Sequence, residues 1–408
     1  MVKQTITMKV RLYPSKEQST EFIKVTKEYQ RLCNIVSQWY FDCKCRVTRK
    51  DFQKDMYFKL RSISKLNSMM VQCVFRTVDA RYKAVNTQLS KRPYHFKDIN
   101  TNNWYNISRD ITWLESPIKF SRPQADYLRS GNYSFVNQGK EISLNVLGKR
   151  IKVKYNDNYL PYSILSKDVK LGTAKLVNLR GRWFFHIPVT REVPEWSRNS
   201  NKHIVGIDRG LRQIMTIYDE SGTTKFFNGR EVSYKRKKFA HLRKQLQAKN
   251  TKSAKRKLKK LGRKENRWMS DVNHQLSKTL IDLYGPNTLF VLEDLTNVTF
   301  NNSFGSKDKN RELKSWSFYD LQAKLEYKAQ GVGSKVITVP AQYTSQRCPK
   351  CGQIKKTNRD HDLHLYQCDH CGFTTNDDRI GAMNLYDLGK QYLIGRENPK
   401  INKANAND

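Results

Sequence analysis

Acidic residues and long apolar runs are both scarce in this sequence. Its 408 residues include 37 Asp and Glu against 76 Lys and Arg, which gives a formal net charge of +39. There is no run of about 18 apolar residues, the length that spans a bilayer. The first residues, Met1–Thr7, lack the apolar core of a secretion signal. We therefore expect a protein that is neither secreted nor embedded in a membrane.

The surplus of positive charge favours an anionic partner. A surface of this charge repels itself unless an anion covers it. Nucleic acid is the natural candidate because it presents a dense line of phosphates, and an acidic membrane surface is the alternative. Hydrophobic residues make up 38% of the chain, which is enough for it to fold. The length suggests two or three domains.

The eight cysteines fall into two groups. Four are irregularly spaced in the first half, where Cys33 and Cys73 lie in apolar stretches typical of a buried core. The other four form two Cys-x-x-Cys pairs separated by sixteen residues: Cys348, Cys351, Cys368 and Cys371. Two such turns can place four thiolates about 2.3 Å from one Zn²⁺ and leave no position open for water, which predicts one structural zinc ion. Disulfide pairing is the alternative, and an intracellular location disfavours it.

The first half of the chain combines helices with a β-domain. Alternating residues predict a strand over 5–13, and Ser15 with Gln18 has the spacing of a capping box at the start of a helical region that extends to about residue 92. Further alternating runs predict an antiparallel β-domain. These runs are Ser116–Phe120, Asn132–Asn137, Glu141–Val146, Lys149–Tyr155, Val169–Leu179 and Trp183–Val189. If the opening strand joins that sheet, the helices are an insertion in it.

The second half has the pattern of an α/β domain. A buried strand over 204–207 is followed by two strands of a meander. Residues 235–267 hold 16 Lys or Arg and one acid, and their leucines predict an amphipathic helix that continues to about residue 280. The remaining predicted elements are a buried strand over 287–292, a helix over 316–328, a strand over 335–339 and a helix over 378–388.

Three acidic residues stand at the ends of these core elements. Asp208 and Glu293 each follow a buried strand, and Asp378 opens the last helix. Carboxylates gathered at one sheet edge repel one another unless a cation lies between them. Such oxygen ligands suit Mg²⁺ or Mn²⁺, and two ions about 3.5–4 Å apart can act on one phosphodiester, which predicts a metal-dependent nuclease. A solvated strand end or a helix cap is the alternative for each acid alone, and Asp294 and Asp377 adjoin the chosen residues.

The basic helix is the main candidate for contact with nucleic acid, and a solvated charged face is the alternative. Its candidate binding residues are Lys235, Arg236, Lys237, Lys238, Arg243, Lys244, Lys255, Arg256, Lys257, Lys259, Lys260, Arg263, Lys264 and Arg267. Aromatic rings can also stack on bases, although packing in a core is the alternative for each ring. The rings in question belong to Trp39, Trp104, Tyr105, Trp113 and Trp183.

Several motifs occur along the chain in a distinctive order. They are Lys9–Gln18, Asn34, Gly206–Gly210, the basic region Lys235–Lys278, Val291–Leu295, Tyr343–Gly352 and Asp378–Leu385. Together they resemble the TnpB family, RNA-guided nucleases of bacterial and archaeal insertion sequences and the ancestor class of type V CRISPR effectors. The segments that contain Asp208, Glu293 and Asp378 resemble the three RuvC motifs of that family. Ile380 departs from the pattern, since the third motif usually carries Asn there.

The resemblance implies an α/β multidomain fold. It consists of a RuvC/RNase H-like nuclease domain with an inserted zinc ribbon, preceded by a β-barrel-like (WED) domain that carries a helical (REC) insertion. The implied boundaries are 1–14 for the first WED strand, 15–95 for the REC-like insertion, 96–197 for the rest of the WED-like domain, 198–341 for the RuvC-like domain with basic helices over 235–280, 342–376 for a zinc ribbon that binds target nucleic acid, 377–392 for the final RuvC helix and 393–408 for a flexible tail.

The resemblance also implies a function and its partners. The expected protein binds a guide RNA, recognises a short motif beside its double-stranded DNA target and cleaves DNA with two Mg²⁺ ions held by Asp208, Glu293 and Asp378. Other transposition proteins are a further class of partner, and the expected location is the nucleoid in a prokaryotic cytoplasm. The alternatives are a compact type V CRISPR effector, an RNA-guided binder or repressor with little cleavage, and a nonspecific nucleic-acid-binding protein. The repressor alternative draws its support from Ile380.

Overall fold

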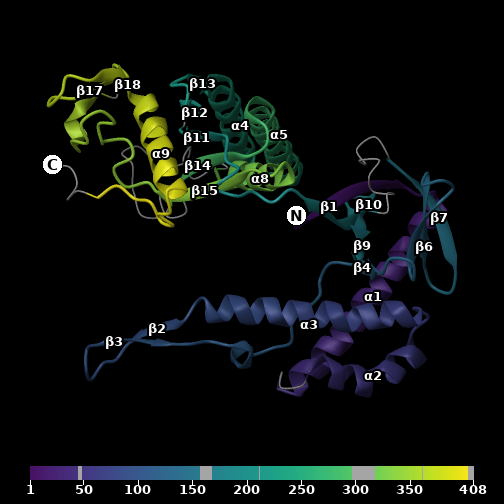
Figure 1. Ribbon diagram of the computed structural model, residues 1–408. Helices are drawn as coiled ribbons and strands as arrows, with labels where there is room; N and C mark the ends of the chain where they lie inside the picture. The colour runs from purple at the N-terminus through teal and green to yellow at the C-terminus, as the bar shows by residue number, and fades with distance from the viewer. Residues whose placement is uncertain (45–47, 157–167, 211, 296–317, 361, 403–408) are drawn as a thin grey trace. The chain divides into compact units, whose positions relative to one another are not determined.

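The computed structural model describes residues 1–44, 48–156, 168–210, 212–295, 318–360 and 362–402 (Figure 1). The chain divides into two compact units. The N-terminal unit is Thr5–Glu192, and the C-terminal unit combines Met1–Gln4 with Val193–Asp408. Within the described ranges, no helix is both long enough and apolar enough to cross a membrane.

The helices of the N-terminal unit follow the predicted pattern. They are α1 (Lys16–Asp42), α2 (Arg49–Ile63) and α3 (Ser68–Ser90). The capping box of α1 is confirmed: the Ser15 hydroxyl accepts a hydrogen bond from the backbone N–H of Gln18, and the Gln18 side chain accepts one from the backbone of Ser15. This reciprocal cap satisfies two of the amide groups that the first turn of a helix leaves without partners.

One eight-stranded sheet forms the other part of this unit. Its strands are β1 (Val2–Tyr13), β4 (Gln124–Tyr127), β5 (Tyr133–Val136), β6 (Glu141–Asn145), β7 (Arg150–Tyr155), β8 (Lys170–Leu171), β9 (Ala174–Leu179) and β10 (Arg182–Val193). Their order is β4-β9-β10-β1-β7-β6-β5, with β8 beside β10. The opening strand therefore lies between β10 and β7, and the prediction that it joins this sheet is confirmed.

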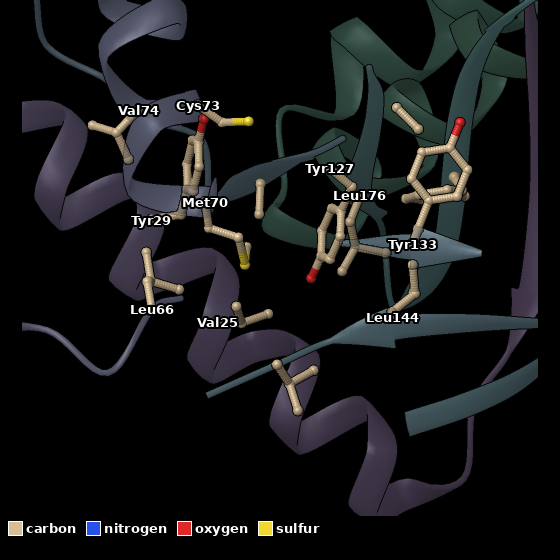
Figure 2. Close-up of a cluster of buried hydrophobic side chains, with 14 of the residues drawn as sticks. Val25, Tyr29, Leu66, Met70, Cys73, Val74, Tyr127, Tyr133, Leu144 and Leu176 are labelled. Carbon is tan, nitrogen blue, oxygen red and sulfur yellow. The ribbon is translucent and has the colours of Figure 1, made fainter. Parts of the chain in front are cut away.

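Helices and sheet share a single core (Figure 2). Tyr29 of α1 and Met70 of α3 lie in the same buried cluster as Tyr127, Tyr133 and Leu176 of the sheet. All five side chains are at most 1% exposed. The helices therefore pack against the sheet through their apolar faces.

The strand predicted at Ser116–Phe120 is wrong, because α1 takes the hydrogen bonds that a neighbouring strand would make. Asn34 accepts a hydrogen bond from the backbone N–H of Phe120 at 2.8 Å and donates one to its carbonyl at 3.2 Å. The hydroxyl of Ser37 donates to the carbonyl of Ile118 at 2.7 Å. The segment therefore follows the helix, and Asn34 has a structural role there.

Two further predicted elements are interrupted. The run Val169–Leu179 divides into β8 and β9, and it lies opposite Pro188 of β10, which has no N–H to continue the ladder. The single basic helix is two helices, α4 (Arg230–Lys249) and α5 (Lys252–Tyr284). Asn250 ends α4 in the left-handed conformation (φ 44°), and the Thr251 side chain then caps α5.

A hairpin that the sequence analysis did not predict follows α3. Its strands are β2 (Tyr94–Lys97) and β3 (Trp104–Ile107), and Figure 1 shows it beyond the C-terminal end of α3. The five aromatic residues considered for base stacking differ in their exposure. Trp39 and Trp183 pack in the core, whereas Trp104, Tyr105 and Trp113 are exposed.

The C-terminal unit is built on a mixed five-stranded sheet. Its strands are β11 (His203–Asp208), β12 (Gln213–Asp219), β13 (Thr224–Asn228), β14 (Thr288–Asp294) and β15 (Lys335–Pro340). The order is β13-β12-β11-β14-β15, with parallel pairing from β11 to β14 and from β14 to β15. The predicted meander is the antiparallel part, β11 to β13.

Helices cover both faces of this sheet. One face packs on α5 and α8 (Phe318–Gly331) through residues such as Val205 and Ile207, and the other packs on α9 (Asp377–Leu393). Because side chains alternate along a strand, Gly206 and Asp208 lie on the α9 face. Part of the helix predicted over 316–328 lies outside the described residues.

A small three-stranded sheet stands between β15 and α9 in the chain. Its strands are β16 (Arg359–Asp360), β17 (Leu365–Gln367) and β18 (Thr374–Asn376). We call residues 342–376 the ribbon. In the tail predicted to be flexible, Ile401 packs against the cluster that contains Tyr392, and residues 403–408 lie outside the described part.

The backbone of α9 lies so close to β11 that only glycine fits at residue 206. A Cβ added there would stand 2.1 Å from the carbonyl oxygen of Ala382 and 2.5 Å from the amide nitrogen of Tyr386.

We expect Gly206→Ala to destabilise the protein by about 2–3 kcal/mol in thermal or urea unfolding, because the backbone of α9 or β11 must move to accommodate the new Cβ. Gly262→Ala is the matched control: a Cβ there meets nothing within 4 Å on helix α5, so it should stabilise by up to about 1 kcal/mol. Equal effects of the two changes would contradict this account.

Candidate active site

Two of the three predicted acids lie side by side at one end of the sheet. β11 and β14 pair in parallel, with Ile207 opposite Leu292. The next residues along these strands are Asp208 and Glu293. Glu293 follows Val291 on the α9 face and is buried, whereas Asp294 points to the other face and is exposed. The alternation of the strand thus places Glu293, and not its acidic neighbour, beside Asp208.

The first turn of α9 brings the third acid. Asn376 caps this helix by accepting a hydrogen bond from the backbone N–H of Asp378 at 3.0 Å. Gly381, one turn later, lies directly against Asp208: a Cβ added to this glycine would stand 2.8 Å from the carboxyl carbon of Asp208. Asp378 is therefore held in the helix turn that lies next to Asp208.

The electrostatics of Asp208 reflect this crowding. Burial raises the pKa of Asp208 well above its usual value, and the charges of Glu293 and Asp378 raise it further. Burial also raises the pKa of Glu293, while a hydrogen bond from Thr344 opposes that rise. Since both carboxylates resist ionisation without a neighbouring cation, the cluster has the property expected of a site for divalent metal.

A cation from the ribbon reaches these acids. Arg359 places Nη2 3.4 Å from a carboxylate oxygen of Asp378 and Nε 3.0 Å from one of Asp377. Its charge lowers the pKa values of Asp208 and Glu293, against the larger effect of burial. Asp377, the neighbour that left the sequence assignment ambiguous, is buried and pairs with Arg359. The ribbon thus supplies part of the local countercharge.

Further hydrogen bonds hold Glu293 and the backbone around it in position. The Thr344 hydroxyl donates to the carboxylate of Glu293, and Arg209 donates to the backbone carbonyl of the same residue. The Asn384 side chain of α9 donates to the carbonyls of Thr344 and Arg347, both at 2.8 Å. These contacts join β14, the start of the ribbon and α9 into one network around the site.

The four predicted cysteine ligands come together in the ribbon. Their sulfur atoms lie within 4.8 Å of one another. Among the described residues, no other group of three or more His, Cys, Asp or Glu has ligand atoms this close together, so the three acids are less tightly gathered than the cysteines. The Sγ atoms of Cys348 and Cys371 are 3.7 Å apart, and those of Cys351 and Cys368 are 3.5 Å apart. Disulfide sulfurs are about 2 Å apart, whereas four thiolates around one zinc ion fit these separations.

Tight turns hold the cysteines in place. Gly352 donates its N–H to the carbonyl of Cys348 and Gly372 donates to that of Cys368, each at 2.9 Å. Both glycines have positive φ values, 82° and 70°, which other residues adopt only with strain. The donor set of four thiols in two such knuckles fits zinc.

Most of the predicted nucleic-acid-binding residues are accessible on α4 and α5. Eleven of the fourteen are exposed, and the partly buried ones are Arg236, Arg243 and Arg263. Arg243 pairs with the buried Glu265, so it joins α4 to α5. The Lys235 ammonium lies 4.5 Å from the centre of the Trp268 ring. The exposed cations form a large positive surface on the helix pair.

The N-terminal unit has a positive cavity of its own. Its volume is about 620 Å³, and it lies between one face of α3 and the segment that leads into β4. Five cations line it: Arg76, Arg81, Lys119, Arg122 and Lys175. The sequence analysis did not identify this cavity, because its residues come from three separate parts of the chain.

Comparison with known proteins places these features in a family. Residues 186–298 match a family described as "Probable transposase", and residues 318–385 match one described as "Cas12f1-like, TNB domain". The TnpB-like protein MJ0751 of Methanocaldococcus jannaschii is 32% identical over 194 residues, which are 45% of this chain and 68% of that protein. The chain belongs to the TnpB-like family. The resemblance stated from the motifs is thereby confirmed.

Two further comparisons concern Cas12f1 proteins. The CRISPR-associated endodeoxyribonuclease Cas12f1 of Sulfoacidibacillus thermotolerans is 40% identical over 116 residues, 28% of this TnpB-like chain and 25% of that protein. The chain thus spans only a quarter of that relative. The fold is similar to that in a cryo-EM structure of a Cas12f1-sgRNA-target DNA complex, with a TM-score of 0.61, 11% identity and coverage of 94% of this chain and 98% of that one.

In this TnpB-like chain the two matched regions contain the whole candidate site. Asp208 and Glu293 lie in the first region, and Asp378 lies with the cysteines in the second. Sequence reasoning missed Arg359 and Thr344, which contact the acids from the ribbon. The motif Tyr343–Gly352 was noted without a role for Thr344, and no local pattern marks Arg359.

We expect removal of one like charge to stabilise the metal-free site. Because the pKa of Asp208 is raised in the folded state, its ionised form destabilises the fold at neutral pH. Asp208→Asn should raise the melting temperature in EDTA by roughly 2–5 °C and reduce the stabilisation that added Mg²⁺ gives. Asp294→Asn, which changes an exposed acid at the end of the neighbouring strand β14, is the control. A lower melting temperature for Asp208→Asn in EDTA would refute the repulsion.

We expect about one zinc ion per chain in elemental analysis of the purified protein. Cys368→Ser should remove the zinc and increase proteolysis of the ribbon, because a segment this small has little core without its metal. Cys43→Ser, which changes a partly exposed cysteine of the N-terminal unit, should leave the zinc content unchanged. Full zinc content in Cys368→Ser would exclude the assigned ligands.

Proposed function

We propose that this TnpB-like protein is an RNA-guided DNA endonuclease. It would hold a guide RNA, recognise a short motif beside its double-stranded target and cleave DNA at Asp208, Glu293 and Asp378. The observation that carries the proposal is the meeting of these three acids beside a close β11–α9 contact, in a chain whose relatives include an endodeoxyribonuclease. The cited TnpB-like and Cas12f1 relatives come from an archaeon and a bacterium, which fits action on DNA in a prokaryotic cytoplasm.

The architecture supports different roles for the two units. The mixed sheet β11–β15 with α9 would be the RuvC/RNase H-like nuclease domain, and the ribbon would be its inserted target-binding part. In the N-terminal unit, the sheet would be the WED-like domain and α1–α3 the REC-like insertion. The fold similarity to a Cas12f1 complex over 94% of the chain supports this arrangement.

The three carboxylates have the chemistry required to hold two Mg²⁺ ions. Bound Mg²⁺ would supply Lewis-acid chemistry for hydrolysis of the phosphodiester. Asp208 and Glu293 offer oxygen ligands from adjacent strands, and α9 fixes Asp378 beside them. Arg359 would keep positive charge next to the acids, where a phosphate group of the substrate has to lie. Thr344 would orient the carboxylate of Glu293 through its hydrogen bond.

A structural zinc ion at the four cysteines would fix Arg359 indirectly. The knuckle that begins at Cys348 and the short helix Lys356–Asn358 lead directly into β16, where Arg359 stands. All four metal positions would be occupied by sulfur, so this ion takes no part in hydrolysis. Its role would be to hold the ribbon in the shape that presents Arg359 to the acids.

The positive surfaces fit a long nucleic-acid partner. The exposed cations of α4 and α5 and the cavity beside α3 would contact phosphates of the guide RNA and of its duplex with DNA. In such a system base pairing reads the target, so the protein needs shape and charge more than base-specific contacts. The net charge of +39 is expected for a protein that binds nucleic acid mainly through its phosphates.

Two alternatives differ in their support. A compact type V CRISPR effector shares all of this chemistry, and the Cas12f1 similarity favours it as the second candidate. An RNA-guided repressor drew support from Ile380. That side chain is fully buried and packs in the cluster with Cys348, Tyr366 and Cys368. The departure from the family motif therefore serves the contact between α9 and the ribbon.

The function can be tested with the protein and its own RNA. The gene is expressed with its flanking DNA, the RNA that copurifies is sequenced, and a plasmid that matches its variable end is offered in Mg²⁺. We expect guide-dependent cleavage that EDTA abolishes. The genomic origin of the RNA, beside a transposon end or a CRISPR array, separates the two endonuclease candidates.

Paired variants make the site assignment specific. Glu293→Gln should lower the cleavage rate by about 100-fold or more while RNA binding persists, because a metal ligand is lost. Asp294→Asn changes the adjacent acid on the opposite face of the same strand and should cleave at nearly the normal rate. Full-rate cleavage by Glu293→Gln would disprove the assignment, and a featureless mixture of copurified RNA would disprove guidance.

A further inference from the structure

The hairpin β2–β3 exposes almost all of its side chains. Seven of its eight strand residues are exposed, and Phe96 is the exception. A two-stranded hairpin in water usually needs a covered face for stability. Here both faces are open, and the large rings on them contribute nothing to the core of the N-terminal unit.

Aromatic rings line one face of this hairpin. The register pairs Phe96 with Tyr105, so these residues share a face with Tyr94. The Phe96 and Tyr105 rings are stacked with centroids 5.7 Å apart, and the Tyr94 and Phe96 rings are stacked at 6.1 Å. Trp113 lies beside Tyr94 at 6.0 Å. We call these four rings the aromatic ladder.

The ladder is accessible and held in position. Tyr94, Tyr105 and Trp113 are 49%, 43% and 45% exposed. Two hydrogen bonds anchor the base of the hairpin: Arg109 donates to the carbonyl of Arg92 at 2.7 Å, and the backbone of Ile111 donates to the Asn86 side chain at 2.8 Å.

The opposite end of the hairpin is also ordered. Asp98 accepts hydrogen bonds from the backbone of Asn100 and the hydroxyl of Thr101, which closes the turn. The rings are therefore presented on a defined surface at both ends of the hairpin.

Charge identifies the partner. The cations Lys91, Arg92 and Arg109 stand at the base of the hairpin that carries the ladder. The two acids between residues 91 and 113, Asp98 and Asp110, each accept hydrogen bonds from backbone N–H groups of their own turns. Half-exposed aromatic rings with flanking cations are the platform on which single-stranded nucleic acids stack their bases.

The size of the ladder argues against a protein partner. Four partly exposed rings offer roughly 300–400 Å², whereas a stable protein interface buries about 800 Å² on each side. A second copy of this chain would need a much larger apolar surface than the hairpin has.

We infer that the aromatic ladder of the β2–β3 hairpin is a binding site for unpaired nucleotides, whose bases stack on Tyr94, Phe96, Tyr105 and Trp113 while the flanking cations contact the phosphates. The inference takes from the proposed function only that nucleic acid is the partner. The strand comes either from DNA or from the guide RNA, since both present the same bases and phosphates.

The test compares strands with and without bases. Full-length protein is titrated with a fluorescein-labelled 12-nucleotide oligothymidine and with an abasic strand of equal length, near 200 mM salt to weaken other phosphate contacts. We expect the wild type to prefer the base-bearing strand by about tenfold. The double variant Tyr94→Ala/Tyr105→Ala should lose this preference while it binds the abasic strand as the wild type does.

Matched variants separate stacking from loss of structure. Tyr105→Phe keeps the ring and should keep the preference. Trp104→Ala removes a ring that is 71% exposed on the opposite face of the same hairpin, so the preference should persist. If the double variant weakens binding of both strands equally, the hairpin has lost its structure or acts by charge alone, and the stacking inference is overturned.

Further measurements show whether the bound strand is RNA or DNA and whether the hairpin instead binds a second copy of the chain. Oligouridine in place of oligothymidine shows whether RNA or DNA is preferred, and an equal preference still supports stacking. No base preference in the wild type, or a change from dimer to monomer in the double variant by light scattering, would overturn the inference. The readout requires neither guide nor cleavage, so failure of guided cleavage with an intact base preference would refute only the proposed function.

Discussion

The close approach of α9 to β11 is the contact on which the candidate site depends. Gly206 and Gly381 remove the two side-chain carbons that would separate the helix from the strand and from Asp208. At that distance the first turn of α9 lies beside the ends of two parallel strands, so acids from three distant parts of the sequence become neighbours. Burial in this contact raises the pKa of Asp208, and the charges of Glu293 and Asp378 raise it further.

Side-chain contacts connect the ribbon to β14 and α9 around the acids. Thr344 reaches Glu293, Asn384 binds the backbone at the start of the ribbon, and Arg359 pairs with Asp377 and Asp378. Ile380 packs against the cysteine knuckles from the α9 side. A metal bound by the cysteines would therefore stabilise the surroundings of the acids without touching them, because the same short segment carries both sets of contacts.

The chain distributes its charge unevenly. Cations cover α4, α5 and the cavity beside α3, while acids gather at the buried end of the central sheet. A polyanion is attracted to the first kind of surface, and cations are attracted to the second. The aromatic hairpin adds a third kind of surface, in which the ring faces are exposed and the flanking charge is positive. Together these surfaces suit a protein that holds nucleic acid over a large area and acts on it at one point.

Features that depend on neighbouring residues in the chain follow from the amino-acid pattern. The alternation of β11 and β14, the capping box at Ser15 and the two cysteine knuckles are local patterns, and each has the conformation its residues favour. Contacts in the folded chain decide that Asn34 replaces a strand partner for Phe120, that Arg359 reaches Asp378, and that Trp104 is exposed whereas Trp183 is buried. These outcomes depend on contacts between residues far apart in the sequence, and local pattern carries no information about which distant backbone comes within a few ångströms.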